Sequence, residues 1–303
     1  MAEQNTNDIR MAVLIDADNV SSDYIKSMME EIARYGNPTV KRIYGDWTKP
    51  NLIGWKKVLL DYAISPVQQF GYTSGKNSTD SAMIIDAMDL LYTEKVDAFC
   101  LVSSDSDFTR LATRLREAGK TVYGMGEQKT PNAFIAACDR FIYIEILEEE
   151  EEEEEHAEAE KSGKADEKKP EQKRQRREKK RSINRINRDI VRFMTQTIRD
   201  VEDENGWAYL GEVGNLLVKK QPSFDPRNYG FSKLSNMLKA MNQYELDIRD
   251  AGTGSPNSKH IFVRVKKKKK KKKNRGNGGN KQTPEKTSLS RDDNIHDKAE
   301  IDF

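Results

Sequence analysis

Short apolar runs alternate with longer amphipathic segments between residues 11 and 146, and this alternation restricts the fold more than any other feature of the chain. The apolar runs predict strands, and the amphipathic segments, in which apolar residues recur every three or four positions, predict helices. Gly119 is typical of the residue that follows a helix. The expected strands are 11–15, 40–44, 65–70, 98–102, 121–124 and 141–144, and the expected helices are 24–34, 53–62, 81–91, 108–118 and 132–137. Such alternation is typical of an α/β fold with a parallel sheet covered by helices on both faces.

The remaining chain divides by composition into a charged linker, a second domain and a basic tail. Residues 148–181 begin with a run of glutamates, continue rich in lysine and arginine, and have almost no apolar side chain. Such a segment cannot form a core, and we expect a disordered linker. The tail, 266–303, begins with eight consecutive lysines and has the composition of a disordered segment. The expected organisation is therefore a first domain at 10–147, the linker, a second domain at 182–265 and the tail.

The second domain combines three amphipathic segments with two short apolar ones. Helices are expected at 183–199, 213–218 and 231–241, and strands at 244–248 and 260–265. Three helices and a hairpin predict a small winged helix-turn-helix arrangement. The first helix should bury the apolar residues of one face, namely Ile186, Ile190, Phe193, Met194 and Ile198.

The cysteines and the apolar segments bear on the cellular compartment. The two cysteines, Cys100 and Cys138, both lie in apolar surroundings, and neither belongs to a pair with metal-ligand spacing. Two buried thiols suit a reducing compartment. Residues 1–10 lack the apolar core of a secretion signal, and no apolar run approaches the roughly 20 residues of a membrane span. We expect a cytoplasmic protein with no membrane partner.

The aspartates of the first domain follow its strands. Asp16 and Asp18 come directly after the first strand, Asp105 and Asp107 directly after the most apolar one, and Asp80 opens the long helix. Carboxyl ends of parallel strands share one edge of the sheet, where ligands bind in such folds. If the first and fourth strands are neighbours, Asp16, Asp105 and Asp107 converge there, and Asp80 approaches from the adjacent helix.

Oxygen-only ligands of this kind suit Mg²⁺ or Mn²⁺ and argue against Zn²⁺. Carboxylates gathered this closely can all be ionised near neutral pH only if cations are present. The three histidines (His156, His260 and His296) all lie outside this domain, which therefore offers no His base and no Ser-His or Cys-His nucleophile pair. Water activated by a metal ion is the chemistry that remains.

A purely structural role is the alternative for each aspartate taken singly. Asp80 before Ser81 and Asp107 before Phe108 are each placed to cap a helix, and Asp18 and Asn19 suit a turn. The repetition of Asp-Asx after two apolar strands favours a shared site instead. Asp86 and Asp89 lie farther along their helix and are interpreted as solvated or structural.

The motifs around these aspartates resemble a known family. Ile15-Asp16-Ala17-Asp18-Asn19, Thr79-Asp80 with Asp86, and Ser103-Ser104-Asp105-Ser106-Asp107-Phe108 resemble the NYN domain, the LabA/DUF88-like branch of the PIN-like nuclease superfamily. The resemblance implies a Rossmann-like α/β fold and Mg²⁺- or Mn²⁺-dependent ribonuclease activity. It makes Asp16, Asp80, Asp105 and Asp107 the metal-binding and catalytic acids and Asn19 a polar neighbour of the site. Some members of the family are regulatory, and many carry glycine at the position of Ser104.

The second domain is similar to the OST-HTH/LOTUS family. The similarity rests on Gly206-Trp207, Gly211-Glu212-Val213 and the segment from Phe224 to Phe231 (FDPRNYGF). It implies a winged-helix module that binds RNA or docks to proteins. NYN and LOTUS domains often share a chain.

Basic residues near the two expected sites are candidates for phosphate contacts. In the first domain they flank the acidic edge, and in the second they lie around its second and third helices. Trp207, Tyr209 and Tyr229 of the second domain are candidates for stacking on bases. Ordinary surface charge and core packing are the alternatives. The candidate RNA-binding residues are Asn19, Lys76, Arg110, Arg114, Lys129, Lys219, Lys220, Arg227, Lys233 and Lys239.

Three functions fit this sequence. The first is a metal-dependent ribonuclease, and the second is a non-catalytic RNA-binding adaptor that docks through its LOTUS domain. The third, a phosphatase or sugar-nucleotide enzyme, fits less well because no glycine-rich phosphate loop follows the first strand. The eight lysines must bind polyanions in a salt-dependent manner. They are also able to pair with Glu148–Glu155 and shield the site, or to serve only as a solubilising tail.

Overall fold

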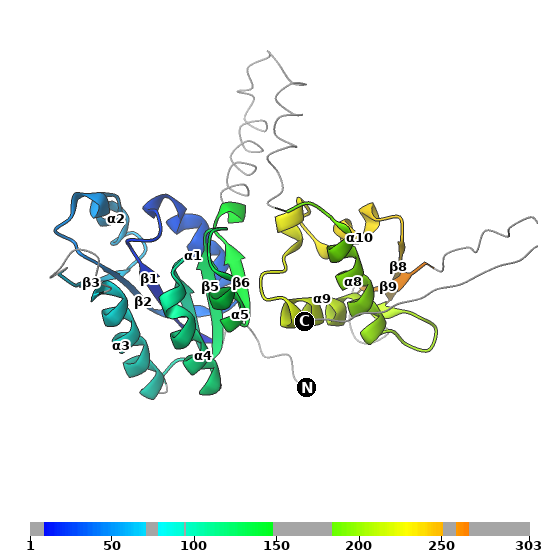
Figure 1. Cartoon of the computed structure of the whole chain (residues 1–303), viewed down its shortest axis with the longest axis horizontal. Coiled ribbons are helices and arrows are strands. Elements are labelled where there is room, and N and C mark those ends of the chain that lie inside the picture. Colours follow the sequence, from blue (N-terminus) through cyan, green and yellow to red (C-terminus); the bar gives the residue numbers. More distant parts are fainter. Residues whose placement is uncertain (1–8, 71–77, 94, 148–183, 251–258, 267–303) are drawn as a thin grey trace, which may run out of the picture. The chain divides into compact units, whose positions relative to one another are not determined.

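The computed structural model describes residues 9–70, 78–93, 95–147, 184–250 and 259–266. Its N-terminal part is a six-stranded sheet in the order β3-β2-β1-β4-β5-β6, and every neighbouring pair is parallel (Figure 1). The strands are β1 (Arg10–Asp16), β2 (Asn37–Gly45), β3 (Ser65–Gln68), β4 (Ala98–Val102), β5 (Thr121–Gly126) and β6 (Arg140–Tyr143). The expected parallel α/β sheet is confirmed, and β1 and β4 are neighbours, as the site prediction requires.

Helices cover both faces of this sheet. Helices α1 (Ile25–Ala33) and α2 (Ile53–Val58) pack on one face, against alternate β1 residues such as Val13. Helices α3 (Ser78–Tyr92), α4 (Thr109–Glu117) and α5 (Asn132–Ala137) pack on the other, against residues such as Leu14. All five residues of β4 are buried, as expected for a central strand with helices on both sides. Short 3-10 helices lie at Ser22–Tyr24 (η2), Pro50–Leu52 (η3) and Ser106–Phe108 (η4).

Two glycines allow the backbone of this part to take its path. Gly119 has φ +78° and ends the turn after α4, a conformation that costs other residues energy. At Gly126 an added Cβ would lie 2.5 Å from the carbonyl oxygen of Ser103, so only glycine lets the end of β5 approach the end of β4 this closely. This close approach shapes the sheet edge that carries the aspartates.

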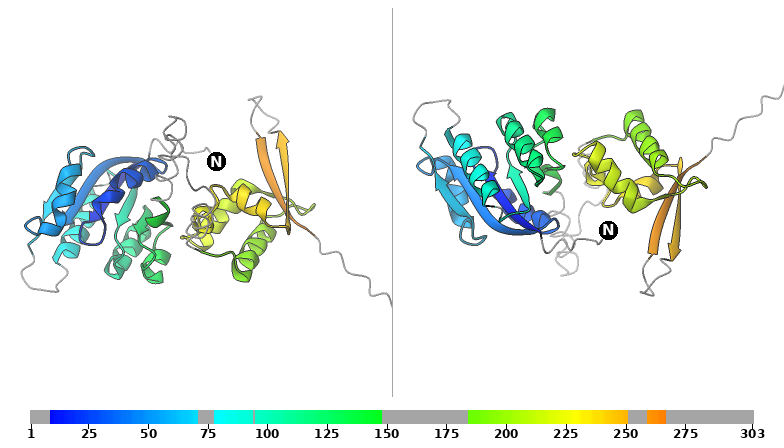
Figure 2. Two further views of the ribbon diagram at one scale, coloured as in Figure 1. Left: turned by 90° about the horizontal axis from the view of Figure 1, so that it is seen from above. Right: turned by 90° about the horizontal axis from the view of Figure 1, so that it is seen from below.

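The C-terminal part is a three-helix unit with a small antiparallel sheet in the order β7-β9-β8. Its elements are α8 (Arg188–Asp200), β7 (Ala208–Tyr209), α9 (Leu210–Lys220), η5 (Pro226–Tyr229), α10 (Leu234–Ala240), β8 (Tyr244–Asp250) and β9 (Lys259–Val265). Figure 2 shows β8 and β9 as a long hairpin beside the helices. One apolar core, which includes Met194, Leu217 and Val263, joins the helices to this sheet. The winged-helix prediction is confirmed.

Several element bounds differ from those expected. Helix α2 ends at Val58, and the chain then turns through Ala63, which has φ +50°. Helix α3 begins at Ser78, so Asp80 lies inside its first turn instead of before it. Helix α8 begins at Arg188 because the side chain of Asn187 accepts hydrogen bonds from the Asp189 and Ile190 amides.

Helix α8 therefore excludes Ile186, which the sequence placed on its buried face. The side chain of Ile186 is 39% exposed, and the burial prediction is wrong for this residue, although Ile190, Met194 and Ile198 are buried. Cys100 and Cys138 are buried, as predicted. In the part of the chain that the structure describes, no helix is both long and apolar enough to cross a membrane. The linker at 148–181 and nearly all of the tail lie outside the described residues.

Candidate metal centre

Two central strands end side by side at the edge of the sheet that carries the aspartates. Strands β1 and β4 pair in register up to Ile15 and Val102, so the residues that follow each strand start from adjacent points. Asp16 is the last residue of β1, and Ser103, Ser104 and Asp105 follow β4 directly. The register itself brings these two loops together.

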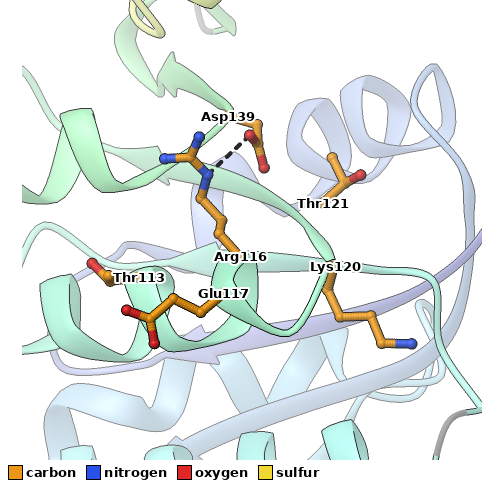
Figure 3. Close-up of a pocket in the computed structure, with 7 residues that line it drawn as sticks. Thr113, Arg116, Glu117, Lys120, Thr121 and Asp139 are labelled. Atoms are coloured by element: carbon orange, nitrogen blue, oxygen red, sulfur yellow. Dashed lines mark ion pairs between the residues drawn. The ribbon is translucent and has the colours of Figure 1, made fainter.

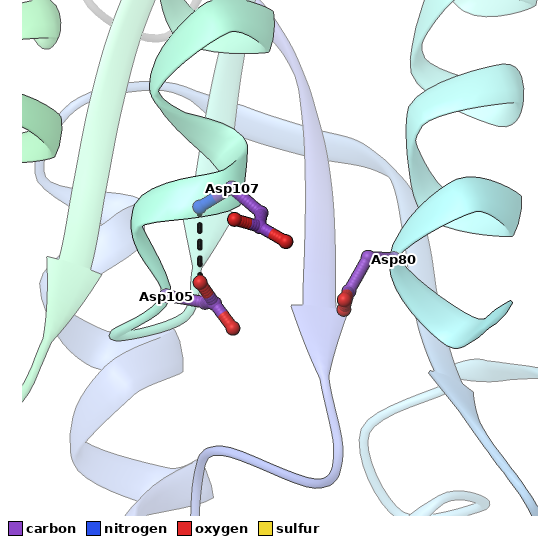
Figure 4. Close-up of side chains that lie close together, drawn as sticks. All are labelled: Asp80, Asp105 and Asp107. Atoms are coloured by element: carbon purple, nitrogen blue, oxygen red, sulfur yellow. Dashed lines mark hydrogen bonds between the residues drawn. The ribbon is translucent and has the colours of Figure 1, made fainter. Parts of the chain in front are cut away.

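Three carboxylates gather at this edge. Asp80, Asp105 and Asp107 each offer an oxygen atom within 4.8 Å of the others' (Figure 4). Asp80 comes from the first turn of α3, whereas Asp105 and Asp107 come from the loop after β4 and from η4. The three residues are separated by up to 27 positions in the sequence, so only the folded sheet brings them together.

Asp16 lies beside this group and is held by hydrogen bonds. Its side chain is buried, with 1% of the residue exposed. Oδ2 accepts hydrogen bonds from Asn19 Nδ2 (2.5 Å) and Ser103 Oγ (2.9 Å), and Oδ1 accepts one from the Asp18 amide (3.1 Å). Asp16 is therefore a fixed carboxylate next to the three others, and it does not belong to the group whose oxygens all lie within 4.8 Å.

Crowding and burial change the acidity of these groups. Burial raises the pKa of Asp80 to about 6, and the neighbouring charges of Asp16, Asp105 and Asp107 add to the effect. Burial likewise raises the pKa of Asp16, although the hydrogen bonds from Asn19, Ser103 and the Asp18 amide oppose that rise. Each shift reflects the cost of holding several negative charges in one small, partly dry space.

The capping alternative holds in part. Asp105 is the N-cap of η4, and its Oδ1 accepts the Asp107 amide at 2.9 Å. Asp107 lies in the first turn of η4, and Asp80 lies inside α3, so neither occupies the cap position that the sequence suggested. Asp105 thus stabilises a helix start while its second oxygen remains available to a ligand.

Ser103 belongs to the site and was missed by the sequence analysis. It is fully buried, its Oγ donates to Asp16 Oδ2, and the same atom accepts the Asp105 amide at 3.1 Å. One hydroxyl thereby links the end of β1 to the loop after β4. The sequence signal was present, since Ser103 directly follows Val102 and precedes the aspartates. Next to it, Ser104 Oγ accepts the amide of Glu127 at 2.9 Å.

The candidate RNA-binding residues of the N-terminal part differ in exposure and in the partners they already have. Asn19 is engaged with Asp16, and Lys129 pairs with Glu127 at 3.0 Å. Arg110 is exposed and Arg114 half-buried, both on α4, the helix that follows the site. Lys76 lies outside the described residues.

The candidate RNA-binding residues of the C-terminal part also differ in exposure and in hydrogen-bond partners. Lys219 and Lys233 are exposed, and so is Lys239. Lys220, at the end of α9, donates to Asp200 and to Thr197 Oγ1. Arg227 is engaged with Asp225, through Nε to Oδ1 at 3.0 Å and Nη2 to Oδ2 at 2.9 Å, so its guanidinium is already committed.

The aromatic candidates differ in the same way. Tyr229 packs against the core, with its ring 6.1 Å from that of Phe224, and is therefore not a free stacking surface. Trp207 is half-buried and Tyr209 is 41% exposed, and both adjoin the three-stranded sheet.

A separate hollow lies at the end of the six-stranded sheet where strands β5 and β6 begin, opposite the end that carries the aspartates. It has a volume of about 530 Å³ and is lined by Thr113, Arg116, Glu117, Gly119, Lys120, Thr121 and Asp139 (Figure 3). Arg116 pairs with Asp139 at 2.9 Å, and Lys120 Nζ donates to the carbonyl of Val96. Its polar groups thus serve to hold the start of β5, and the carboxylate group lies at the other end of the strands.

Several solved structures resemble parts of the chain. A protein of unknown function from Vibrio parahaemolyticus is 20% identical, with 47% of this chain and 96% of that chain covered and a TM-score of 0.40. An uncharacterized protein from Nitrosomonas europaea is 35% identical over 26% of this chain and 73% of that one, with a TM-score of 0.23. The WlbA dehydrogenase from Bordetella pertussis, solved with NADH and UDP-GlcNAcA, is 15% identical over 45% and 34% of the chains, with a TM-score of 0.27. No curated protein matches the chain.

Family models give the identification. The model of the NYN domain matches residues 10–145, which include the whole carboxylate group and the sheet that positions it. The model of the OST-HTH/LOTUS domain matches residues 182–256, within the three-helix part. Both resemblances seen in the sequence are confirmed, in the expected order. The chain therefore joins an NYN domain, which is PIN-like, to an OST-HTH/LOTUS domain, and the two domains together support an RNA-related role in nuclease action or binding.

Proposed function

We propose that this protein is a metal-dependent ribonuclease that hydrolyses RNA phosphodiesters, with the OST-HTH/LOTUS domain holding the RNA. The observation that carries the proposal is the gathering of Asp80, Asp105 and Asp107, with oxygens within 4.8 Å of one another, in a domain of the nuclease superfamily. Carboxylates this close are stable together when a cation shares them.

The donor set fits Mg²⁺ or Mn²⁺. All the ligand atoms that the group offers are carboxylate oxygens, and both cysteines of the chain are buried elsewhere. Hard oxygen donors select Mg²⁺ or Mn²⁺ over Zn²⁺. A divalent ion held there would supply an activated water and would neutralise charge on the phosphodiester.

Residues of the site fall into those that would bind the ion and those that position them. Asp80, Asp105 and Asp107 would hold the ion. Asp16 would stand beside them, oriented by Asn19 and by Ser103, whose hydroxyl also fixes the loop that bears Asp105. Such supporting hydrogen bonds keep metal ligands in a usable geometry.

The test uses the purified full chain with mixed RNA and Mn²⁺ or Mg²⁺. Wild type should cut RNA, and Asp105→Asn should not, while RNA binding survives. Asparagine caps a helix as well as aspartate does, so this variant should retain η4 and its fold. Asp80→Asn is the second variant, and Asp89→Asn, an exposed position on the same helix, is the matched control that should cut normally.

Two results would separate the nuclease from the adaptor. If Mn²⁺ raises the melting temperature of wild type but not of Asp105→Asn, the carboxylate group binds the ion. If wild type binds RNA yet cuts no RNA with either ion, the nuclease proposal is wrong, and a non-catalytic RNA-binding adaptor takes its place.

A further inference from the structure

The outer face of the three-stranded sheet in the OST-HTH/LOTUS domain carries aromatic and arginine side chains. Strand residues alternate between faces, and Val263 of β9 points into the core. Its neighbours Phe262 and Arg264 therefore project from the opposite side, together with their cross-strand partners. We define the outer sheet face by six residues: Trp207, Tyr209, Arg249, His260, Phe262 and Arg264.

The rings and guanidinium groups of this face are stacked on one another. Arg249 Cζ lies 4.2 Å from the centroid of the Phe262 ring and 5.2 Å from that of Trp207, and Arg264 Cζ lies 4.5 Å from that of Trp207. The Tyr209 ring is 5.1 Å from His260 and 5.8 Å from Phe262. The result is one continuous group of flat π systems across three strands.

Carboxylates on the same face hold the two guanidinium groups. Arg249 Nε donates to Asp247 at 2.9 Å, and Arg264 Nη2 donates to Glu245 at 2.7 Å. These bonds use N–H groups at the edge of each guanidinium, so they restrain its plane and leave its faces for stacking. They also neutralise most of the local charge.

The outer sheet face remains accessible to a ligand. Tyr209 is 41% exposed, and the Arg249 and Arg264 side chains are 40% and 38% exposed. None of the strand side chains that we assign to this face is aliphatic, so it differs from an ordinary apolar core surface. Flat, nearly neutral side chains offer little to a phosphate group but much to an unpaired base.

We infer that the outer sheet face binds single-stranded RNA by stacking unpaired bases on Tyr209, Phe262 and the arginine planes. Positive charge at both ends of β9 fits the phosphates of such a strand, because Lys259 begins β9 and Lys266 follows it. Double-stranded RNA hides its base faces and would not fit. The inference rests on the proposed RNA-binding role of this domain and specifies which surface and which form of RNA are used.

The inference retains Trp207 and Tyr209, which the sequence suggested for stacking, and places the bases on the sheet instead of on the basic helices. The helix candidates Lys219 and Lys233 are exposed point charges. They suit phosphate contacts that any RNA offers, whereas the outer sheet face distinguishes single strands from duplexes.

The experiment measures RNA binding by the full chain without cutting. The protein carries Asp105→Asn and the buffer contains EDTA. The probes are a fluorescein-labelled 12-nucleotide unstructured RNA and the same RNA annealed to its complement. The single strand should bind more tightly than the duplex. Tyr209→Thr and Phe262→Thr, which suit a strand but remove the ring, should each weaken single-strand binding by roughly 10-fold.

Matched variants separate stacking from charge and from misfolding. Tyr209→Phe retains the ring and should bind single-stranded RNA as tightly as the parent, in contrast to Tyr209→Thr. Arg249→Lys retains the charge but loses the plane, and it should weaken binding without changing the salt dependence. Lys219→Ala and Lys233→Ala should mainly reduce the salt dependence. Melting temperatures close to that of the parent show that a variant is folded.

Specific outcomes would overturn the inference. Equal affinity for single strand and duplex, or full affinity in folded Tyr209→Thr and Phe262→Thr, would exclude the outer sheet face as a base-binding surface. If it binds no RNA and instead captures a protein through the same residues, the inference is also wrong. Ribonuclease activity is measured separately on the wild-type chain, so loss of stacking and absence of cutting are distinct results.

Discussion

Asp80 lies half-buried among three other aspartates, and this crowding makes the stability of the fold depend on pH. Its pKa is about 6 in the folded chain, against an ordinary value of 3.8. The folded state therefore binds this proton more tightly than the unfolded state, and the resulting stability is fully present below pH 3.8 and lost as pH rises through about 6. At pH 8 without metal, the charged carboxyl destabilises the fold.

Asp80→Asn should remove that penalty. In EDTA at pH 8 the variant should exceed wild type in free energy of unfolding by about 1 kcal/mol, a modest gain because water screens a half-exposed carboxyl. The advantage should shrink as pH falls through about 6, and Mn²⁺ should reverse it by stabilising only wild type. Urea unfolding at several pH values measures this, with Asp89→Asn as control; a difference that does not vary with pH would contradict it.

Residue spacing predicted which acids meet but not how each is held. The positions of Asp80, Asp105 and Asp107 follow from strand ends and a helix start, which sequence periodicity locates well. The hydrogen bonds that hold Asp16 depend on side-chain rotamers and on the register of β1 with β4, which periodicity does not specify. For the same reason the sequence did not separate Arg227, engaged with Asp225, from exposed cations such as Lys219.

At the scale of elements, the carboxylate of Asp86 connects helix α3 to strand β2 through a hydrogen bond and an ion pair. Tyr44, buried in β2, donates its hydroxyl to Asp86 at 2.7 Å, and Arg42 pairs with the same carboxylate at 2.7 Å. The structure thus supports the structural interpretation of Asp86 that its position in the helix suggested. Because α3 also bears Asp80, this attachment positions the helix that contributes to the metal centre.

Asp86→Ala should destabilise the protein by about 1–3 kcal/mol, because a buried tyrosine hydroxyl loses its acceptor. Chemical denaturation measures the loss, and Tyr44→Phe in the same chain should recover part of it by removing the donor. Asp89→Ala on the exposed side of α3 should change stability by less than about 0.5 kcal/mol. A fully stable Asp86→Ala chain would show that the attachment is not needed.

The order and type of elements were predictable, whereas some of their ends were not. Strong periodicity located all six parallel strands and the three helices of the second domain. The start of α8 depended on one side chain, Asn187, which caps the helix after the apolar pattern has already begun. Strand β7 was missed because two residues, Ala208 and Tyr209, carry no detectable alternation.

For the whole molecule, the net positive charge is concentrated in residues 266–303. Residues 266–303 carry 13 basic and 6 acidic side chains, a difference of +7, although the full chain has a net charge of only +2. An RNA-binding protein with this distribution should gain much of its salt-dependent affinity from the lysine run.

A chain ending at Lys266 should therefore bind RNA with a weaker salt dependence. The slope of log affinity against log salt should fall by about 0.7 for every lysine that contacts a phosphate of single-stranded RNA. A chain ending at Lys273 retains the eight lysines and is the matched control. If the shorter chain binds RNA more tightly than the control, the lysines pair with Glu148–Glu155 and shield the protein from RNA.

The central pairing of β1 with β4 also determines when the carboxylate group can form during synthesis. Met11 pairs with Ala98, and the last of the three acids is Asp107, so a shorter nascent chain can pair β1 with β2 but lacks a complete β4 or the acids that follow it. Long-range pairing of this kind forms late. The carboxylate group of the metal centre therefore forms only after β4 and the loop that follows it have left the exit tunnel of the ribosome.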